Sequence, residues 1–430
     1  MDVDEIRAHP LLKERARYLG TLEARNVPSP ATRSDIEHAI RNPVGPREKP
    51  RSCLEHIHPG ESLCLVVSDS TRKTAADRVL PVLLDGLIER GCRTSDMTVL
   101  VATGIHRPPT RDEVRRILGD RAWTLLGSRV ELHDPDDRTR LVHVGTTRRG
   151  QPVRIHSRAA ESDRLVLLGA AVYHYHAGFG GGRKSLVPGV ASRDTIAQNH
   201  SLTLDPDADR IHPGVGPGCL DGNPVAEEML EAARLHPPDF IINTVLDAAG
   251  RLAGIFAGEL DAAHRAACRQ VEAMFRVDLE EPTDLVVASA EGAPNWIQSH
   301  KALFNAWRAC RPGLVLLVAP CPEGIGDERF RYWMRRPALA ALYRELRATP
   351  EVLGQTALST RAKANHTLLV TRLAEPDRQD LHMQAEPDID RGIRTALDRL
   401  AAGGNRRPTY RLMPQARYTV PFPESERPVV

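Results

Sequence analysis

The sequence lacks an excess of either charge. It carries 58 Lys and Arg against 56 Asp and Glu in 430 residues, a formal net charge of +2 at pH 7. Nucleic acids and anionic membranes attract proteins through a strong field of one sign. The near balance therefore argues against both kinds of partner and favours a small-molecule substrate.

Long apolar runs are also missing. The first residues, MDVDEIRAHPLLKERARYLG, include early acids and no apolar core of signal-peptide length. No later stretch approaches the roughly 20 apolar residues that span a bilayer. We therefore expect a cytoplasmic protein.

Cysteines are few and show no metal or disulfide spacing. The seven are scattered, odd in number and never spaced as CxxC. This argues against a disulfide framework or a zinc ribbon, and we expect most of them to be buried thiols.

Lysine is the scarcest charged residue, because arginine supplies nearly all of the positive charge. The lysines are Lys13, Lys49, Lys73, Lys184, Lys301 and Lys363. Lys184 stands close to Gly181 and Gly182 in the segment YHYHAGFGGGRKSLVPG. Only a neutral amine, and not a guanidinium, can act as a nucleophile that bonds covalently to a cofactor or substrate. Lys184 is therefore the first candidate functional residue.

The same segment resembles the phosphate-binding pattern GxxxxGK[ST], but its register fails. Counted from Gly178, the glycine required before the lysine is Arg183. A bulky residue there prevents the tight turn that phosphates need, which argues against a nucleoside triphosphatase. The glycines instead let the backbone approach another large ligand, or they form only a flexible surface turn.

Short apolar runs alternate with helical patterns, which is typical of the α/β fold class. We expect strands over residues 63–69, 97–102, 164–171 and 240–246, and a helix over 75–91. An alanine-rich helix over 262–275 reads as a connector. A second α/β pattern then follows, with strands over 284–289, 314–319 and, last, 366–372, and a helix over 297–310.

The sequence thus predicts two α/β domains with a catalytic cleft between them. The N-terminal domain, residues 1–270, would carry the cofactor site, and the C-terminal domain would span 280–400. Residues 401–430 contain several prolines, and we expect a tail that folds against a neighbour or is loosely ordered.

Three polar motifs follow three of the expected strands. They are Asp69-Ser-Thr-Arg72, Thr103-Gly-Ile-His106 and the loop from His174 to Lys184. In open α/β sheets the loops that leave the carboxyl ends of strands build the ligand site. We therefore expect these motifs to meet in one crevice.

Four histidines are candidates for chemistry. His174 and His176 flank a tyrosine, so in an extended chain both rings would project to one face, as metal ligands or acid/base pairs do. Each is also compatible with a purely structural role. His106 ends a strand, and His200 follows an expected short helix over 194–199, where a single imidazole would suit nickel, copper or zinc.

Two pairs of polar residues are spaced by three. Arg72 could fork onto a carboxylate or phosphate with Asp69 holding a hydroxyl, or the two could form a surface ion pair at a helix start. Gln298 and Lys301 would share one face of a helix, where they could close on a substrate or simply be solvated.

Taken together, the motifs resemble the nickel-pincer-nucleotide-dependent lactate racemase family over most of the chain. The matching segments are DSTR at 69–72, TGIHRP at 103–108, HYHAGFGGGRKSLVPG at 174–189, NH at 199–200, GNPV at 222–225, QSHKA at 298–302 and PCPEGIGDERF at 320–330.

The resemblance implies a covalent cofactor. Lys184 would be joined through a thioamide to a nickel-pincer nucleotide, pyridinium-3,5-bisthiocarboxylate mononucleotide, and nickel would be held by carbon, two sulfurs and His200. Gly181 and Gly182 would border the cofactor, and Asp69 would orient it or Arg72. Separate biosynthetic enzymes would load it.

The resemblance also implies an isomerase, a racemase or epimerase of 2-hydroxy acids. A base takes the hydroxyl proton, hydride moves from C2 to the cofactor, and it returns to either face of the 2-oxo acid. His106 and His174 would be the opposed acid/base groups. Arg72, Gln298 and Lys301 would bind the carboxylate.

Two departures from the family pattern bear on the substrate. His176 stands where lactate racemases usually carry an aromatic residue, and Ile297 replaces the usual tyrosine. We therefore expect the pocket to differ from a lactate pocket, with His176 able to bind a second carboxylate or a distal hydroxyl of malate, a sugar acid or another 2-hydroxy acid.

Three alternatives stay open at this point. The chain could be a C2 epimerase of longer sugar acids, or a non-catalytic nickel-nucleotide binding protein, which the two candidate acid/base histidines argue against. A zinc hydrolase using His106, His174 and His176 is the third, although no carboxylate is spaced as its usual partner.

Overall fold

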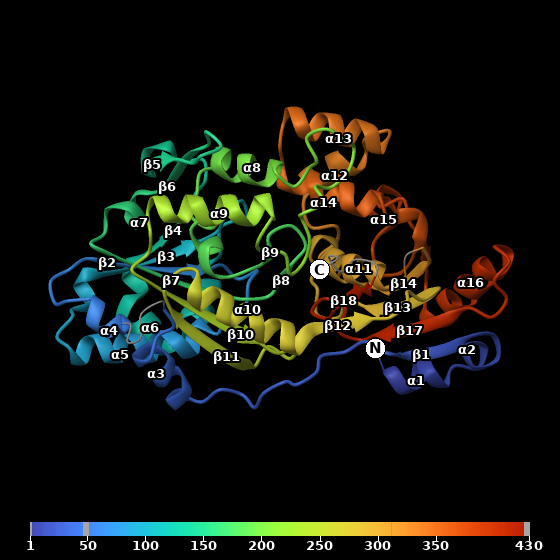
Figure 1. Cartoon of the computed structure of the whole chain (residues 1–430), viewed down its shortest axis with the longest axis horizontal. Coiled ribbons are helices and arrows are strands. Elements are labelled where there is room, and N and C mark those ends of the chain that lie inside the picture. The colour runs from blue at the N-terminus through green and yellow to red at the C-terminus, as the bar shows by residue number, and fades with distance from the viewer. Residues whose placement is uncertain (1, 46–50, 311, 425–430) are drawn as a thin grey trace. The chain divides into compact units, whose positions relative to one another are not determined.

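A computed structural model describes residues 2–45, 51–310 and 312–424, and the chain forms two compact units (Figure 1). The N-terminal unit comprises Val27–Asp205 and Ile211–Glu272. The C-terminal unit comprises Met1–Asn26, Pro206–Arg210 and Ala273–Val430. Each is built on a six-stranded sheet with helices, which confirms the α/β class.

The sheet of the N-terminal unit has the strand order β11-β10-β7-β2-β3-β4. Its strands are β2 (Leu63–Ser68), β3 (Met97–Ala102), β4 (Val130–Leu132), β7 (Arg164–Ala170), β10 (Phe240–Leu246) and β11 (Leu252–Gly258). All neighbours are parallel except β10 and β11. The four strands expected in this part of the sequence are confirmed, whereas β4 and β11 were not predicted.

Helices and small sheets complete the N-terminal unit. The helices are α3 (Arg33–Arg41), α4 (Cys53–His56), α5 (Ala76–Glu89), α6 (Arg111–Leu126), α7 (Ser157–Glu161), α8 (Arg193–Ser201), α9 (Pro224–Leu235) and α10 (Ala262–Phe275), which runs on into the C-terminal unit. The two-stranded sheets pair β5 (Leu141–Thr146) with β6 (Pro152–His156), and β8 (Tyr173–His174) with β9 (Gly178–Phe179).

Strand β2 shows why the central strands read as unbroken apolar runs. Leu63, Leu65 and Val67 pack into a core with buried residues of α3, α5 and α6, while Cys64 and Val66 between them are also buried. A parallel sheet covered on both faces selects apolar residues at every position of its central strands. The strand can therefore expose polar groups only beyond its carboxyl end.

The sheet of the C-terminal unit has the order β1-β17-β13-β14-β15-β16. These strands are β1 (Arg17–Thr21), β13 (Leu285–Ser289), β14 (Leu314–Val318), β15 (Thr367–Val370), β16 (Gln384–Glu386) and β17 (Thr409–Met413), and β12 (Arg276–Leu279) pairs separately with β18 (Val420–Pro423). The helices are α1 (Val3–Ala8), α2 (Pro10–Arg15), α11 (Trp296–Ala309), α12 (Glu328–Met334), α13 (Leu339–Ala348), α14 (Val352–Arg361), α15 (Glu375–Asp380) and α16 (Ile389–Ala402).

The two units differ from the predicted domains, 1–270 and 280–400, at both ends of the chain. Residues 2–26 belong to the C-terminal unit, where Ile6 and Leu12 join its core. The predicted tail is wrong for residues 409–423, because β17 lies inside the sheet between β1 and β13 and β18 pairs with β12. Residues 425–430 of that tail lie outside the described part. Pairing partners hundreds of residues away, and not the local prolines, decide this segment.

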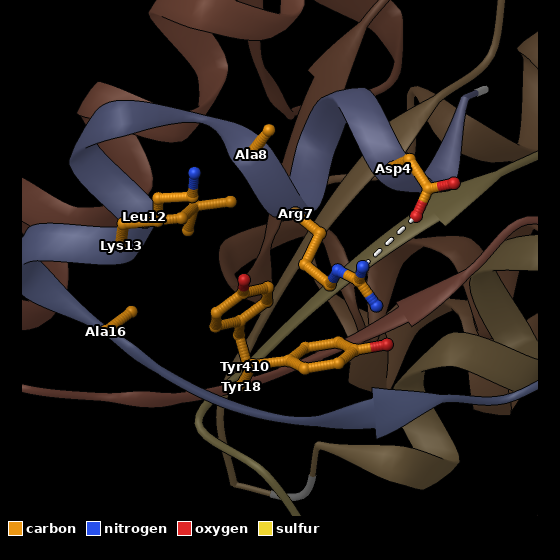
Figure 2. A pocket seen from close by; sticks show the side chains of 8 residues that line it. All are labelled: Asp4, Arg7, Ala8, Leu12, Lys13, Ala16, Tyr18 and Tyr410. Atoms are coloured by element: carbon orange, nitrogen blue, oxygen red, sulfur yellow. Dashed lines mark ion pairs between the residues drawn. The ribbon is translucent and has the colours of Figure 1, made fainter.

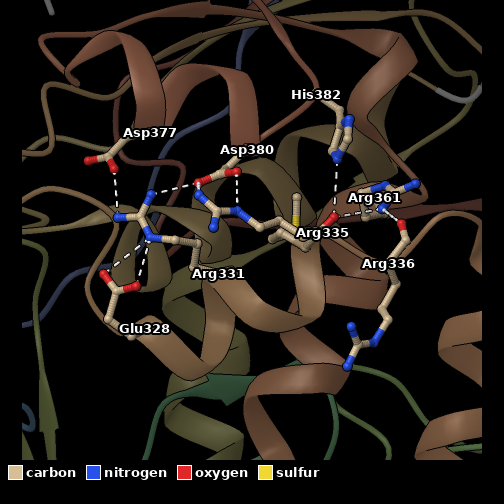
Figure 3. A network of polar contacts seen from close by, with 9 residues as sticks. Glu328, Arg331, Arg335, Arg336, Arg361, Asp377, Asp380 and His382 are labelled. Atoms are coloured by element: carbon tan, nitrogen blue, oxygen red, sulfur yellow. Dashed lines mark hydrogen bonds and ion pairs between the residues drawn. The ribbon is translucent and has the colours of Figure 1, made fainter.

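An ion-pair network ties α12 to α15 beside the PCPEGIGDERF segment (Figure 3). Arg331 contacts Asp377 at 2.8 Å and Asp380 at 2.6 Å, and Arg335 contacts Asp380 at 2.8 Å. The preceding loop is joined to the start of α11, since Trp296 donates its backbone N–H to the Gly324 carbonyl. The network thus stabilises the surroundings of the helix that carries Gln298 and Lys301.

Two further expectations concern the cysteines, predicted to be mostly buried thiols, and the absence of a long apolar segment. All seven cysteines are free thiols, and all but Cys219 are buried. Within the described residues, no helix is both long and apolar enough to cross a membrane.

Candidate functional site

The three polar motifs meet at one edge of the N-terminal sheet. Strands β7, β2 and β3 are consecutive neighbours and parallel, so their carboxyl ends lie together. The backbone also joins the second motif to the segment that follows the third, because Gly104 donates its N–H at 2.9 Å to the carbonyl of Gly189, which lies beyond Lys184. The convergence expected from the sequence is present in the fold.

His106 is oriented by a carboxylate. Its Nδ1 lies 2.7 Å from Oδ2 of Asp69, which is 2 % exposed and also accepts a 2.6 Å hydrogen bond from the Thr71 hydroxyl. Burial by itself raises the pKa of Asp69, but the bonds from His106 and Thr71 hold it below its ordinary value. A carboxylate only accepts, so Nδ1 of His106 carries the hydrogen and Nε2 carries the lone pair.

This pairing gives Asp69 a partner that the sequence did not predict. The carboxylate orients His106, and its predicted orientation of the cofactor stays a prediction. Asp69 and Arg72 do not form the ion pair at a helix start that was the alternative. The backbone N–H of Arg72 instead bonds to the Asp69 carbonyl, and α5 begins later, at Ala76.

Lys184 lies in a short 3-10 turn, Gly182–Ser185. The guanidinium groups of Arg72 and Arg183 are close enough to act on its charge. Burial lowers the pKa of its ammonium to about 7, and the charges of Arg72 and Arg183 act in the same direction. A cation surrounded by protein atoms and by other cations loses its proton easily. A large fraction of Lys184 is therefore a neutral amine at neutral pH.

His200 stands near Lys184 at the end of α8. It is 4 % exposed, and burial together with the Lys184 charge lowers its pKa to about 4. Its Nδ1 lies 2.9 Å from the Ile196 carbonyl and must donate to it. The ring is thus a neutral imidazole whose Nε2 has the lone pair, the form in which histidine binds metals.

The glycine turn before Lys184 is held by two residues that the sequence analysis did not single out. Asn243 Oδ1 accepts the Gly182 N–H at 2.7 Å. His264 Nε2 donates to the Gly180 carbonyl at 2.9 Å, and its Nδ1 accepts from Arg183 Nη1 at 3.0 Å. The two side chains fix the turn from β10 and α10.

Gly182 also has no room for a side chain. It has φ of +52°, and a Cβ there would stand 2.8 Å from the His264 ring, while a Cβ on Gly181, at φ of +77°, would stand 2.8 Å from Asn243 Oδ1. L residues rarely adopt this conformation. Both glycines are therefore required by the turn itself, besides any contact with a cofactor.

Residues 174–176 are not extended, so the condition under which both histidine rings would project to one face is not met. Strand β8 ends at His174, whose Nδ1 accepts the backbone N–H groups of His176 and Ala177 at 3.2 and 3.1 Å. The chain turns there, and the His174 and His176 rings meet edge to face with centroids 6.1 Å apart. His174 is partly exposed, whereas His176 is 3 % exposed.

The remaining predicted residues belong to the C-terminal unit. Ile297, Gln298 and Lys301 lie in the first two turns of α11, whose N-cap Asn295 accepts the Gln298 N–H at 3.1 Å. The three-residue spacing does place Gln298 and Lys301 on a helix, as expected. All three side chains are partly exposed.

The C-terminal unit also holds a cavity of about 630 Å³ that contains none of the predicted site residues (Figure 2). Its lining includes Arg7, Lys13, Tyr18 and Tyr410, from α1, α2, β1 and β17. Within the described residues, no group of three His, Cys, Asp or Glu side chains is arranged to hold a metal ion. A metal would therefore need donors other than a cluster of such side chains.

A signal for one missed residue was present in the sequence. Asn243 interrupts the apolar run FIINTVL, and it is fully buried. A polar residue in a buried strand needs a hydrogen-bond partner and so points to a specific role. His264 lies in the alanine-rich helix interpreted as a connector, and nothing in that pattern distinguished it.

Known proteins share this architecture and sequence. The family model of the lactate racemase N-terminal domain matches residues 8–211. The lactate racemase of Thermoanaerobacterium thermosaccharolyticum is 30 % identical over 305 residues, which cover 70 % of this chain and 68 % of that protein. The lactate racemase of Lactiplantibacillus plantarum is 28 % identical over 419 residues, with 92 % and 91 % covered.

Solved structures agree. The lactate racemase apoprotein of Thermoanaerobacterium thermosaccharolyticum superposes with a TM-score of 0.82 at 25 % identity, covering 94 % of this chain and 95 % of the other. A structural-genomics protein of Thermotoga maritima, at 16 % identity, covers 92 % and 99 % with a TM-score of 0.68 and shows the fold alone.

The similarity to lactate racemases in sequence and fold indicates an isomerase of the racemase class. The chain belongs to the lactate racemase family.

Proposed function

We propose that the protein is a 2-hydroxy acid racemase or epimerase that works with a nickel-pincer nucleotide attached to Lys184. The observation that carries this proposal is the meeting of a buried amine, a neutral imidazole and an oriented acid/base histidine at one sheet edge. These are Lys184, His200 and His106, the last held by Asp69.

The residues fit the proposed cofactor. A neutral Lys184 amine has the lone pair that thioamide formation needs, and His200 offers Nε2 to nickel. Arg72 Nη1 and Asn243 Nδ2 are buried donors without a hydrogen-bond partner in the described part of the chain. Buried donors are normally satisfied, so these two favour a ligand with acceptor groups. When bound, the nickel nucleotide supplies the acceptor for the substrate's C2 hydride.

Side chains of the protein would take the hydroxyl proton of the substrate and bind its carboxylate. Nε2 of His106 would take the proton of the substrate hydroxyl, with Asp69 stabilising the imidazolium that forms. His174 would serve the opposite enantiomer. The residues that we propose for the substrate carboxylate are Arg72, Gln298 and Lys301.

The proposed substrates are small 2-hydroxy acids, with lactate as the reference because the named relatives are lactate racemases. His176 and Ile297 distinguish this chain from the lactate pattern. His176 stacks edge to face on Tyr175 at 4.2 Å between ring centroids, close to His174. We propose that it shifts preference toward acids with a second carboxylate or a distal hydroxyl.

The first experiment combines intact mass, bound nickel and chiral analysis of protein made together with the cofactor biosynthetic enzymes. We expect an adduct with stoichiometric nickel, absent from Lys184→Ala, and interconversion of the enantiomers of at least one 2-hydroxy acid. Unmodified, nickel-free protein under conditions that load an authentic lactate racemase would overturn the proposal. An adduct without racemisation of any 2-hydroxy acid would support a binding protein instead.

A further inference from the structure

A buried histidine outside the motifs connects the two catalytic turns of the N-terminal unit. His133 follows β4 directly and is 2 % exposed. Its backbone N–H bonds to the Val101 carbonyl at 3.1 Å, and its carbonyl accepts the Thr103 hydroxyl at 2.7 Å. The turn that begins at Thr103 ends at His106, which donates its N–H back to the Thr103 carbonyl.

The ring of His133 reaches the other turn. Its Nε2 lies 2.9 Å from the carbonyl of Ala191, in the segment that follows Lys184. Gly189 of that segment returns a hydrogen bond to the Lys184 carbonyl at 3.0 Å and accepts the N–H of Gly104 at 2.9 Å. The backbone and the ring of His133 therefore join the His106 turn to the segment after Lys184, in addition to the direct bond from Gly104 to Gly189.

The hydrogen bonds define the state of this ring. The Ala191 carbonyl only accepts, so Nε2 carries the hydrogen, and Nδ1 has no hydrogen-bond partner in the described residues. Burial lowers the pKa of His133 to about 4, and the neighbouring His156 acts in the same direction against Asp134 and Asp136. The His133 ring therefore stays neutral and donates one hydrogen bond, to the Ala191 carbonyl. Its role is to join two segments of the chain, and not to act as an acid or a base.

We propose that His133 is a positioning residue that sets the distance between the proposed acid/base His106 and the cofactor lysine Lys184. The inference rests on the proposed function, because it assigns His133 a part in that reaction. A displacement of reacting groups by roughly 1 Å can lower a reaction rate about 10²-fold. Loss of the His133 hydrogen bond should therefore lower kcat, although no group that touches the substrate is removed.

His156 provides a matched control. It is 1 % exposed, and its ring packs against that of His133 with centroids 5.8 Å apart at 70°. The hydrogen bond formed by its ring is local, because Nδ1 accepts the Arg158 N–H at the start of α7. His156→Met should therefore loosen the same core without releasing the link between the two turns.

The test compares His133→Met, which loses the donor, with His133→Gln, which keeps one, and with His156→Met. In the cofactor-free protein, we expect the Gly104 amide to exchange with deuterium at least about tenfold faster in His133→Met than in His156→Met. His133→Gln should restore most of the protection. In the loaded enzymes, kcat should fall about tenfold or more in His133→Met alone, with KM within about twofold of the wild type.

Equal Gly104 exchange and equal kcat in His133→Met and His156→Met would overturn the inference. If His133→Met does not fold, Thr103→Val takes its place, because it removes only the 2.7 Å bond to the His133 carbonyl. Normal Gly104 protection and normal kcat in Thr103→Val would then overturn it. A wild type that neither loads nor racemises would reject the proposed function, while Gly104 exchange would still test the link.

Discussion

Nδ1 of His106 donates to Oδ2 of Asp69 across 2.7 Å, although the two residues lie on different strands' loops. This pair gives the first prediction. In Asp69→Asn, kcat should fall about 10²-fold to 10⁴-fold, because the amide no longer stabilises the imidazolium or enforces the tautomer with its lone pair on Nε2. Steady-state kinetics in both directions of racemisation measure this effect.

A matched control for Asp69→Asn is Thr71→Val. It removes the 2.6 Å hydroxyl bond to Asp69 and the 3.2 Å contact of the same hydroxyl with Nδ1 of His106, but leaves the bond between His106 and Asp69. It should retain most of the activity. Equal losses in the two variants would show that the Asp69 carboxylate matters only for the shape of the loop.

The second prediction concerns the pH dependence of cofactor attachment. The pKa of Lys184 is lowered to about 7, so its amine is protonated below that pH and neutral above it. The rate of adduct formation should rise about tenfold per pH unit below pH 7 and level off above it. Intact-mass time courses in buffers from pH 5 to pH 10, with the pH ranges chosen to bracket that pKa, measure the profile.

Lys184→Arg is the control for this experiment, since a guanidinium keeps the charge and cannot form the bond. It should show no adduct at any pH. A wild-type rate that continues to rise steeply from pH 8 to pH 10 would contradict the lowered pKa, because it would indicate the ordinary lysine pKa of 10.5.

The third prediction is structural. Gly182→Ala puts a Cβ 2.8 Å from the His264 ring at φ of +52°, so overpacking and backbone strain should together lower the free energy of unfolding by about 2 to 4 kcal/mol. Urea denaturation of the cofactor-free protein measures the loss. Gly150→Ala separates the two causes, because Gly150 has φ of +78° and nothing within 4 Å of its added Cβ.

For Gly150→Ala we expect only the smaller backbone cost, about 1 kcal/mol. If both alanine variants lose the same stability, the His264 contact contributes nothing to the requirement for glycine at position 182.

The fourth prediction addresses substrate choice. In His176→Phe, the ratio of kcat/KM for a dicarboxylic or polyhydroxy acid to that for lactate should fall about tenfold or more, because a polar partner for the distal group is lost. Parallel chiral assays of lactate, malate and a sugar acid measure it. His143→Phe, an exposed position on β5, should leave the ratio unchanged. An unchanged rank order in His176→Phe would remove His176 from substrate recognition.

The amino-acid sequence by itself determined the central strands of the two sheets and the motifs at the ends of three of them. Central parallel strands such as β3, Met97–Ala102, are apolar at nearly every position because both faces are covered, and that pattern is readable locally. The polar residues that follow each strand stand out for the same reason. The sequence alone is therefore enough to predict that Asp69, His106 and Lys184 lie at a shared sheet edge.

The tertiary structure decided what depends on partners distant in the chain. The start of the chain and residues 409–413 form neighbouring strands, β1 and β17, of the C-terminal sheet, although almost 400 residues separate them. The hydrogen bond between His106 and Asp69, the cradle of Asn243 and His264, and the link through His133 likewise join separate elements. Local periodicity carries information about burial, whereas hydrogen-bond partners form only when the chain has packed. The hydrogen bonds of the candidate site therefore depend on the tertiary structure.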